Sequence, residues 1–313
     1  MKTFNYKLKN INVEEVIDFS DYVNEENILI QVFCGESKKR FQNIIETVCK
    51  ELPQAVCIGA TSDGEIEASN VYTLNTVISV SIFRHTSIKG SFKTSSSSYE
   101  NGIDLSTDII TPNSKVLILF ASVLNTNGDE FLKGVETVNN NIIVAGGVAS
   151  TASDYKNSFV SFGDQLFNSG MVGVSLNSDV LKVNNDFRFN WMPVGTEHII
   201  TKVKENKVYT IDNINAVDFY KKYLGNEIMH SLYEDGTQFP LIILSDDIPR
   251  GRVVIDKDSE SLTFNGNFEK NDIVKFGFGQ AEIIMKEPHK AYQKLLDNHA
   301  ESFFVYSCMA RRR

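Results

Sequence analysis

The feature that most constrains the fold of this chain is a pattern that occurs twice, in which two apolar runs flank an amphipathic helical segment. The apolar runs are residues 28–33 and 56–58 in the first copy, and 116–120 and 142–145 in the second. Between them, apolar residues recur at helical spacing from Phe41 to Leu52 and from Phe131 to Val138. Each copy therefore predicts a strand, a helix and a strand, with the two strands paired in parallel through a right-handed crossover.

The segments around these units predict mainly short strands. Apolar residues alternate with serines at 76–83, which predicts a half-buried strand with one wetter face, and residues 94–98 predict a polar loop. Helices are predicted at 216–224, between Asn213 and Gly225, and after Pro288. The remaining predicted strands are 159–162, 171–176, 199–204, 207–211, 241–244, 252–255, 261–264, 273–278 and 303–306.

This order of elements predicts a mixed α/β (α+β) fold in two related halves, each a mixed sheet on a strand-helix-strand unit with additional antiparallel strands. The length of 313 residues suits two domains, which we place at 1–212 and 213–313. Residues 30–34 resemble residues 304–308, and basic residues follow both segments. We expect residues 28–33 and 303–306 to be equivalent buried strands of a repeated unit, and the second copy to be cut short at Arg313.

Composition excludes several classes of function. Acidic residues outnumber basic ones by 40 to 31, and a net charge of −9 repels phosphate backbones and anionic lipid. We therefore expect no nucleic-acid partner and no membrane insertion. No apolar run approaches the ~18 residues of a membrane helix, and residues 1–10 do not form a signal-peptide core, so we expect a cytoplasmic protein.

The sequence predicts no metal site and no cofactor. The Walker phosphate-binding pattern is absent, and residues 277–279 lack the third glycine of a dinucleotide fingerprint. Five histidines are scattered without metal-ligand spacing. The cysteines, which lack C-x-x-C spacing and lie mostly in apolar stretches, predict inert thiols and no disulfide; they are Cys34, Cys49, Cys57 and Cys308.

The strongest candidate for a ligand site is the turn at residues 59–65, which follows a predicted strand. Thr61, Ser62, Asp63 and Glu65 supply hydroxyls and carboxylates at the place where open α/β sheets bind ligands. The structural alternative, in which Asp63 begins a tight turn and Ser62 caps it, has about even odds for such a motif.

Two further candidates have structural alternatives of similar or greater weight. Gly146 and Gly147 follow a strand, and their backbone N–H groups could converge on an anion, although glycines more often relieve crowding in a turn or close packing. Arg250 could hold a carboxylate through its guanidinium, or it could pair locally with Asp246 and Asp247.

Five segments, taken in order, resemble those of FIST domains. They are residues 57–66, 146–147, 170–174, 191–195 and 306–311. The resemblance covers nearly the whole chain. It implies a sensory domain of a bacterial, archaeal or eukaryotic signalling protein, which binds small ligands such as amino acids and passes the signal to an output domain or partner protein. It also adds Ser307, Cys308 and Arg311 to the candidate ligand-binding residues, and Arg311 is expected to point toward Asp63 and Glu65.

Three hypotheses for function follow. The first is a cytoplasmic sensory input domain without catalysis, which binds an amino acid or a related small carboxylate and signals by a conformational shift. The second is an adaptor module that binds a partner protein and no small molecule. The third, an enzyme with Cys57 or Cys308 as nucleophile, requires a histidine beside one of these thiols.

Overall fold

The computed structural model describes residues 1–124, 126–151, 157–187, 191–227, 239–244, 249–279 and 299–309. The chain forms two compact units. Unit 1 comprises Met1–Asn185 with Ala300–Arg311, and unit 2 comprises Asp186–His299 with Arg312–Arg313. The predicted mixed α/β class is confirmed in both units.

The first sheet of unit 1 has six strands. Their order is β1 (Lys2–Leu8), β6 (Thr76–Ile82), β2 (Ile28–Cys34), β3 (Val56–Thr61), β10 (Val160–Phe162) and β11 (Gln165–Phe167). Strands β2 and β3 run parallel and are joined by helix α1 (Lys38–Glu51), as predicted. Ile30 and Val32 of β2 pack against Phe41 and Ile44 of α1, so one face of this sheet is buried under the helix.

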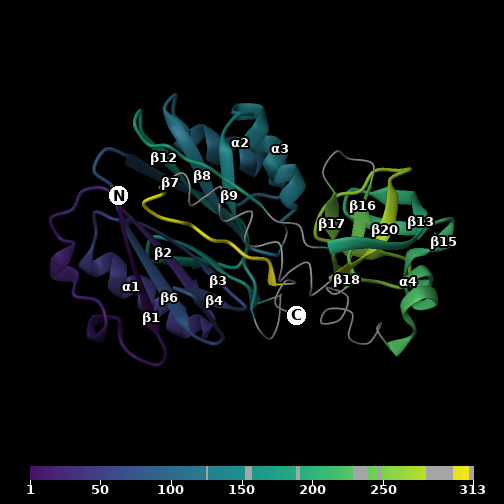
Figure 1. Cartoon of the computed structure of the whole chain (residues 1–313), viewed down its shortest axis with the longest axis horizontal. Helices are drawn as coiled ribbons and strands as arrows, with labels where there is room; N and C mark the ends of the chain where they lie inside the picture. The colour runs from purple at the N-terminus through teal and green to yellow at the C-terminus, as the bar shows by residue number, and fades with distance from the viewer. Residues whose placement is uncertain are drawn as a thin grey trace. The chain divides into compact units, whose positions relative to one another are not determined.

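The second sheet of unit 1 has four strands and two covering helices. Its order is β7 (Ser87–Lys93), β12 (Met171–Asn177), β8 (Ser114–Ala121) and β9 (Ile143–Val148), with α2 (Ser98–Ile109) and α3 (Gly128–Val138). Leu117 and Leu119 of β8 face the helices, whereas Ile118 and Phe120 face the first sheet. The layers are therefore helix, sheet, sheet and helices (Figure 1). Residues 116–121 of β8 form a continuous apolar run because both faces of the strand are buried there.

The two sheets of unit 1 repeat one arrangement of four strands. The order β1-β6-β2-β3 corresponds to β7-β12-β8-β9, and in each set only the last two strands are parallel. Gly59 pairs with Val32 as Gly146 pairs with Leu119. The structural repeat thus relates residues 2–82 to 87–177 within unit 1.

The expected equivalence of residues 28–33 and 303–306 is wrong. Residues 28–34 form a central strand, whereas the segment 299–309 contains no strand and exposes Phe303 and Val305. This segment instead passes between the two sheets of unit 1 (Figure 1). Tyr306 packs against Phe33 and Phe120, and its hydroxyl donates to Gln31 Oε1 at 2.6 Å.

Unit 2 is built on an eight-stranded sheet. Its order is β17 (Arg250–Arg252), β16 (Leu241–Ile243), β20 (Ile273–Gly279), β13 (Trp191–Lys204), β14 (Lys207–Ile211), β19 (Leu262–Phe264) and β18 (Val254–Lys257), with β15 (Ile214–Asn215) on β14. Helix α4 (Ala216–Leu224) places Phe219 and Tyr220 in the core. The smaller elements of unit 1 are η1 (Val13–Glu15), η2 (Phe19–Asp21), β4 (Glu65–Glu67) and β5 (Asn70–Tyr72).

Some local expectations need correction. Strand β6 has no wet face, because Ser79 and Ser81 are buried with its apolar residues. The polar loop ends at Ser97, whose hydroxyl accepts from the Glu100 N–H and caps a helix that the sequence did not predict. Asn215, not Asn213, caps α4. The helix predicted after Pro288 lies outside the described residues.

Candidate functional site

The turn predicted as a ligand site lies where the parallel strands of both sheets end. Thr61 is the last residue of β3, and its hydroxyl accepts from the Phe159 N–H at 2.9 Å. The Ser150 N–H, just beyond β9, donates to the Thr61 carbonyl at 3.0 Å. The carboxyl ends of β3 and β9 therefore meet, as expected where an α/β fold holds a ligand.

The residues after Thr61 form a compact polar turn. The Ser62 N–H donates to the Cys34 carbonyl at 3.1 Å, and the Ser62 hydroxyl donates to Glu65 Oε1 at 2.6 Å. The second oxygen, Glu65 Oε2, accepts from the Asn75 N–H at 3.2 Å. Glu65 is only 1% exposed and Asp63 only 5%. The turn thus holds two carboxyl groups away from bulk water.

Gly35, which directly follows β2, makes room for the buried carboxyl group. A Cβ atom at this position would lie 2.3 Å from Glu65 Oε1, which is shorter than any real contact of this kind. The Gly35 N–H donates to the Asn75 carbonyl at 2.7 Å, so its backbone is fixed. A side chain at residue 35 would displace Glu65 from its position.

Sequence reasoning missed the part of the site that lies beyond β2. The Thr76 hydroxyl donates to Glu36 Oε2 at 2.7 Å and lies 3.3 Å from Cys34 Sγ. Arg40 on α1 lies 3.6 Å from the same Glu36 oxygen. The rule that ligands bind at strand ends could have found Glu36, because β2 ends two residues before it. We call the complete set the turn cluster: Cys34, Glu36, Thr61, Ser62, Asp63, Glu65 and Thr76.

The buried cysteines are poor nucleophiles. Burial raises the pKa of Cys34 to about 11, despite the hydrogen bond with Thr76. The pKa of Cys57 is also raised, because its thiol hydrogen-bonds Cys49 and is fully buried. Cys308 is exposed. In the described part of the chain, no histidine hydrogen-bonds Cys57 or Cys308, so the arrangement required by the thiol-enzyme hypothesis is not found there.

The two glycines of β9 differ in their surroundings. Gly146 has a φ of +129°, and a Cβ atom there would lie 1.9 Å from the Leu119 carbonyl oxygen. Gly147 has nothing within 4 Å of such an atom. Close packing against β8 therefore requires a glycine at position 146, as in the alternative that glycine relieves crowding. Gly147 has open space beside it.

The remaining candidates lie elsewhere or outside the described residues. Ser307 and Cys308 are exposed in the segment that follows Tyr306 in unit 1. Arg250 belongs to unit 2, where it is exposed at the start of the edge strand β17. Arg311, which is expected to point toward Asp63 and Glu65, falls outside the described residues.

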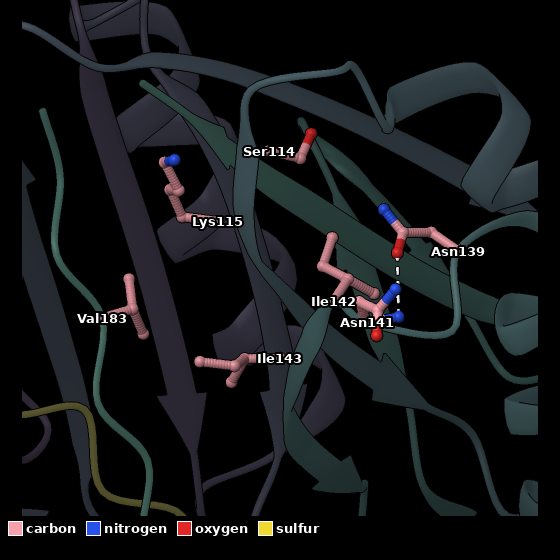
Figure 2. Close-up of a pocket in the computed structure, with 7 residues that line it drawn as sticks. All are labelled: Ser114, Lys115, Asn139, Asn141, Ile142, Ile143 and Val183. Atoms are coloured by element: carbon pink, nitrogen blue, oxygen red, sulfur yellow. Dashed lines mark hydrogen bonds between the residues drawn. The ribbon is translucent and has the colours of Figure 1, made fainter. Parts of the chain in front are cut away.

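Two cavities in unit 1 are lined by other residues. A cavity of about 260 Å³ lies at the amino ends of β8 and β9, where the Asn139 carboxamide oxygen accepts from the Asn141 N–H (Figure 2). Its lining comprises Ser114, Lys115, Asn139, Asn141, Ile142, Ile143 and Val183. A second cavity of about 660 Å³ lies between η1 and α1. Arg40 lines this second cavity and also contacts Glu36. The second cavity therefore adjoins the turn cluster.

Comparison with family models identifies the chain. The FIST N domain model matches residues 28–214, and the FIST C domain model matches residues 216–313. The chain belongs to the FIST family. FIST domains are sensory domains of signal-transduction proteins. No curated protein matches the sequence.

The FIST N match begins at the first residue of β2, and the FIST C match begins at the first residue of α4. The FIST N match therefore includes most of unit 1, strands β13 and β14 of unit 2, and the first residue of β15. Within the described ranges, no helix has the length and apolar character needed to span a membrane.

Proposed function

We propose that this FIST protein is a cytoplasmic input domain that binds an amino acid or a related small carboxylate at the turn cluster. The observation that carries the proposal is the burial of the Glu65 and Asp63 carboxyl groups at the ends of parallel strands. Burial of a carboxylate is costly unless hydrogen bonds or charges offset it. The hydrogen bonds from Ser62 and Asn75 hold the Glu65 carboxyl group in place, so a ligand ammonium group would bind acceptors that are already oriented.

The predicted residues divide between the two ends of such a ligand. Within unit 1, Ser62, Asp63 and Glu65 bind the ammonium group, and the Gly147 N–H binds the carboxylate. The other members of the proposed ligand-binding set are Thr61, Gly146, Ser307, Cys308 and Arg311.

The proposed signal is a shift between conformations, and the turn cluster takes part in no catalytic step. A ligand changes such an equilibrium only by binding one state more tightly than the other. An output domain or partner protein then recognises the favoured state.

A thermal-shift screen of amino acids and small carboxylates tests this proposal. A ligand at 100 times its dissociation constant adds ~2.7 kcal/mol of stability. The shift should disappear in Glu65→Gln, which removes the buried charge at nearly constant size. It should persist in Glu67→Gln, which removes the same charge from the same short strand. Uniformly null shifts refute ligand sensing, and a shift retained by Glu65→Gln places the ligand elsewhere.

The adaptor function is the second candidate, and a specific surface favours it. Strands β4 and β5 form a hairpin in which Ile66 pairs with Val71. Val71 is 63% exposed, and the nearby Leu74 is 58% exposed. A contiguous exposed apolar patch is typical of a surface that binds a partner, and these side chains lie close together on the hairpin and just after it. Val71→Asp should abolish partner binding if the hairpin is the contact, and it should leave any ligand-induced thermal shift unchanged.

A further inference from the structure

A second polar constellation lies in unit 2, and none of its residues belongs to the proposed ligand set. His198 of β13 is 4% exposed, and its Nδ1 lies 2.7 Å from Asp212 Oδ2. Its Nε2 lies 3.2 Å from Thr196 Oγ1. A hydroxyl, an imidazole and a carboxylate are therefore linked in series, which is the arrangement of an activated nucleophile with its base and an orienting acid.

The hydrogen bonds determine the direction of proton flow. A carboxylate can only accept, so the proton of the neutral imidazole lies on Nδ1 and points to Asp212. Nε2 is then an acceptor, and the Thr196 hydroxyl donates to it. This is the tautomer in which a histidine can take a proton from a hydroxyl nucleophile.

The imidazole is fixed in place from two sides. Asp212 Oδ1 accepts from the Ile199 N–H at 2.8 Å, which immobilises the carboxylate. The rings of Phe219 and Tyr223 on α4 pack edge-on against the His198 ring, with centroid distances of 4.8 and 5.0 Å. A base held in this way needs little rearrangement during a reaction.

A bulge brings the hydroxyl to the base. Val194 pairs with Phe276 and His198 pairs with Val274, so β13 has two extra residues between these pairs. Gly195, at a φ of +80°, begins the bulge and has open space beside it. Residues 195–197 therefore leave the ladder with β20, and Thr196 is exposed. Bulges recur next to active sites because they redirect side chains and free backbone N–H groups.

We propose that Thr196 is a nucleophilic residue that accepts an acyl group from an uncharged carboxylic ester or thioester. A bond forms between Thr196 Oγ1 and the acyl carbon, and the bond from that carbon to the leaving oxygen or sulfur breaks. The hydroxyl proton passes to His198 Nε2 and then to the leaving group, so no oxidant or other co-reactant is needed. Bulge N–H groups, which are outside the β13–β20 ladder, supply donors for the developing oxyanion.

An uncharged, apolar acyl chain suits the approach to this bulge. Met192 and Val194 precede it on β13 and are 39% and 42% exposed. Glu197 within the bulge pairs with Lys275 at 3.3 Å, which offsets its charge. Thr196 and His198 would be the catalytic residues because they contact the reacting atoms, and Asp212 would be a positioning residue.

The experiment treats the full chain with p-nitrophenyl acetate and follows two readouts. The burst of nitrophenolate gives the rate, and peptide mass spectrometry locates the added acetyl group. The expected result is one acetyl group at Thr196, retained in Thr196→Ser and absent in Thr196→Ala. His198→Gln should slow the burst ~100-fold. Asp212→Asn should also slow the burst, because an amide at residue 212 favours the wrong tautomer of His198. Asp212→Glu, which keeps the carboxylate, should be faster than Asp212→Asn.

Matched controls separate chemistry from folding. Thr201 lies on the same strand, but its hydroxyl contacts Thr210 at 2.7 Å and no histidine among the described residues, so Thr201→Ala should leave the burst unchanged. Thermal midpoints identify variants that unfold. If His198 variants do not fold, selective acetylation of Thr196 over Thr201 in the wild type decides the question. Acetylation of lysines alone overturns the proposal. Acetylation of Thr196 at the wild-type rate in a folded Asp212→Asn protein also overturns it. These readouts do not depend on the turn cluster, so they are independent of the sensory proposal.

Discussion

Replacement of Gly146 or Gly147, the two adjacent glycines of β9, by alanine should change the unfolding free energy by very different amounts, although the chemical change is the same. At Gly146, alanine must adopt a φ of +129°, a region essentially restricted to glycine, at a cost of ~1–3 kcal/mol. Its Cβ would also lie 1.9 Å from the Leu119 carbonyl oxygen, so β9 must move away from β8. Overpacking of this kind adds ~1–3 kcal/mol. The expected loss of unfolding free energy for Gly146→Ala is therefore ~2–6 kcal/mol.

At Gly147, an added Cβ meets nothing within 4 Å, and the residue does not have a positive φ. Alanine there restricts the unfolded chain and should change stability by less than ~1 kcal/mol. Urea unfolding of both variants, followed by circular dichroism, measures the difference. A Gly146→Ala protein as stable as the wild type would refute the close approach of β9 to β8. Equal losses in both variants would refute the distinction between the two glycines.

Three further outcomes are expected. Glu65→Ala removes the acceptor of the buried Asn75 N–H and should lower the unfolding free energy by ~1–3 kcal/mol. Glu65→Gln keeps an acceptor and should lower it by less. Equal losses of unfolding free energy in urea would contradict this expectation. Tyr306→Phe removes the hydroxyl that donates to the buried Gln31 carboxamide at 2.6 Å, so it should lower the unfolding free energy by ~1–3 kcal/mol. No measurable change would argue against the position of the segment around Tyr306 between the two sheets of unit 1. Burial raises the pKa of Cys34 from 9.0 to about 11, so the folded state favours the thiol. This contribution is complete below pH 9.0 and is lost as the pH rises toward 11, so unfolding curves across this range should show a steeper loss in the wild type than in Cys34→Ala.

Predictions from sequence succeeded where burial is complete. The strands β2 and β8 are predicted well because both faces of each strand are covered, which leaves a continuous apolar run. The predictions from sequence failed where the packing of unit 1 buries polar residues. Ser81 appeared to face water because its strand alternates, but its hydroxyl contacts Thr3 Oγ1 at 3.0 Å in the interior of unit 1.

The repeat was sought in the wrong place for a similar reason. Residues 30–34 and 304–308 look alike because both are mainly apolar and end in cysteine, yet only the first segment has ladder partners on both sides. The true equivalence of Gly59 and Gly146 depends on register, which sequence similarity does not reveal.

The candidate site was predicted only in part. The residues of one turn were found because they are contiguous, namely Thr61, Ser62, Asp63 and Glu65. Glu36 and Thr76 join them from distant parts of the sequence, through the pairing of β2 with β6. The Thr196–His198 contact depends on a bulge that the strand pattern at 199–204 does not indicate.

The internal repeat of unit 1 also bears on why the turn cluster is polar. The Ser62 N–H donates to the Cys34 carbonyl at 3.1 Å, and at the equivalent place the Ala149 N–H donates to the Ala121 carbonyl at 2.7 Å. The backbone of the second copy thus ends its parallel strand in the same way with alanine at this position. The strand end itself therefore does not require the Ser62 hydroxyl that binds Glu65. Because the backbone of the second copy forms without a hydroxyl at this position, the presence of Ser62 in the first copy supports its proposed role in binding.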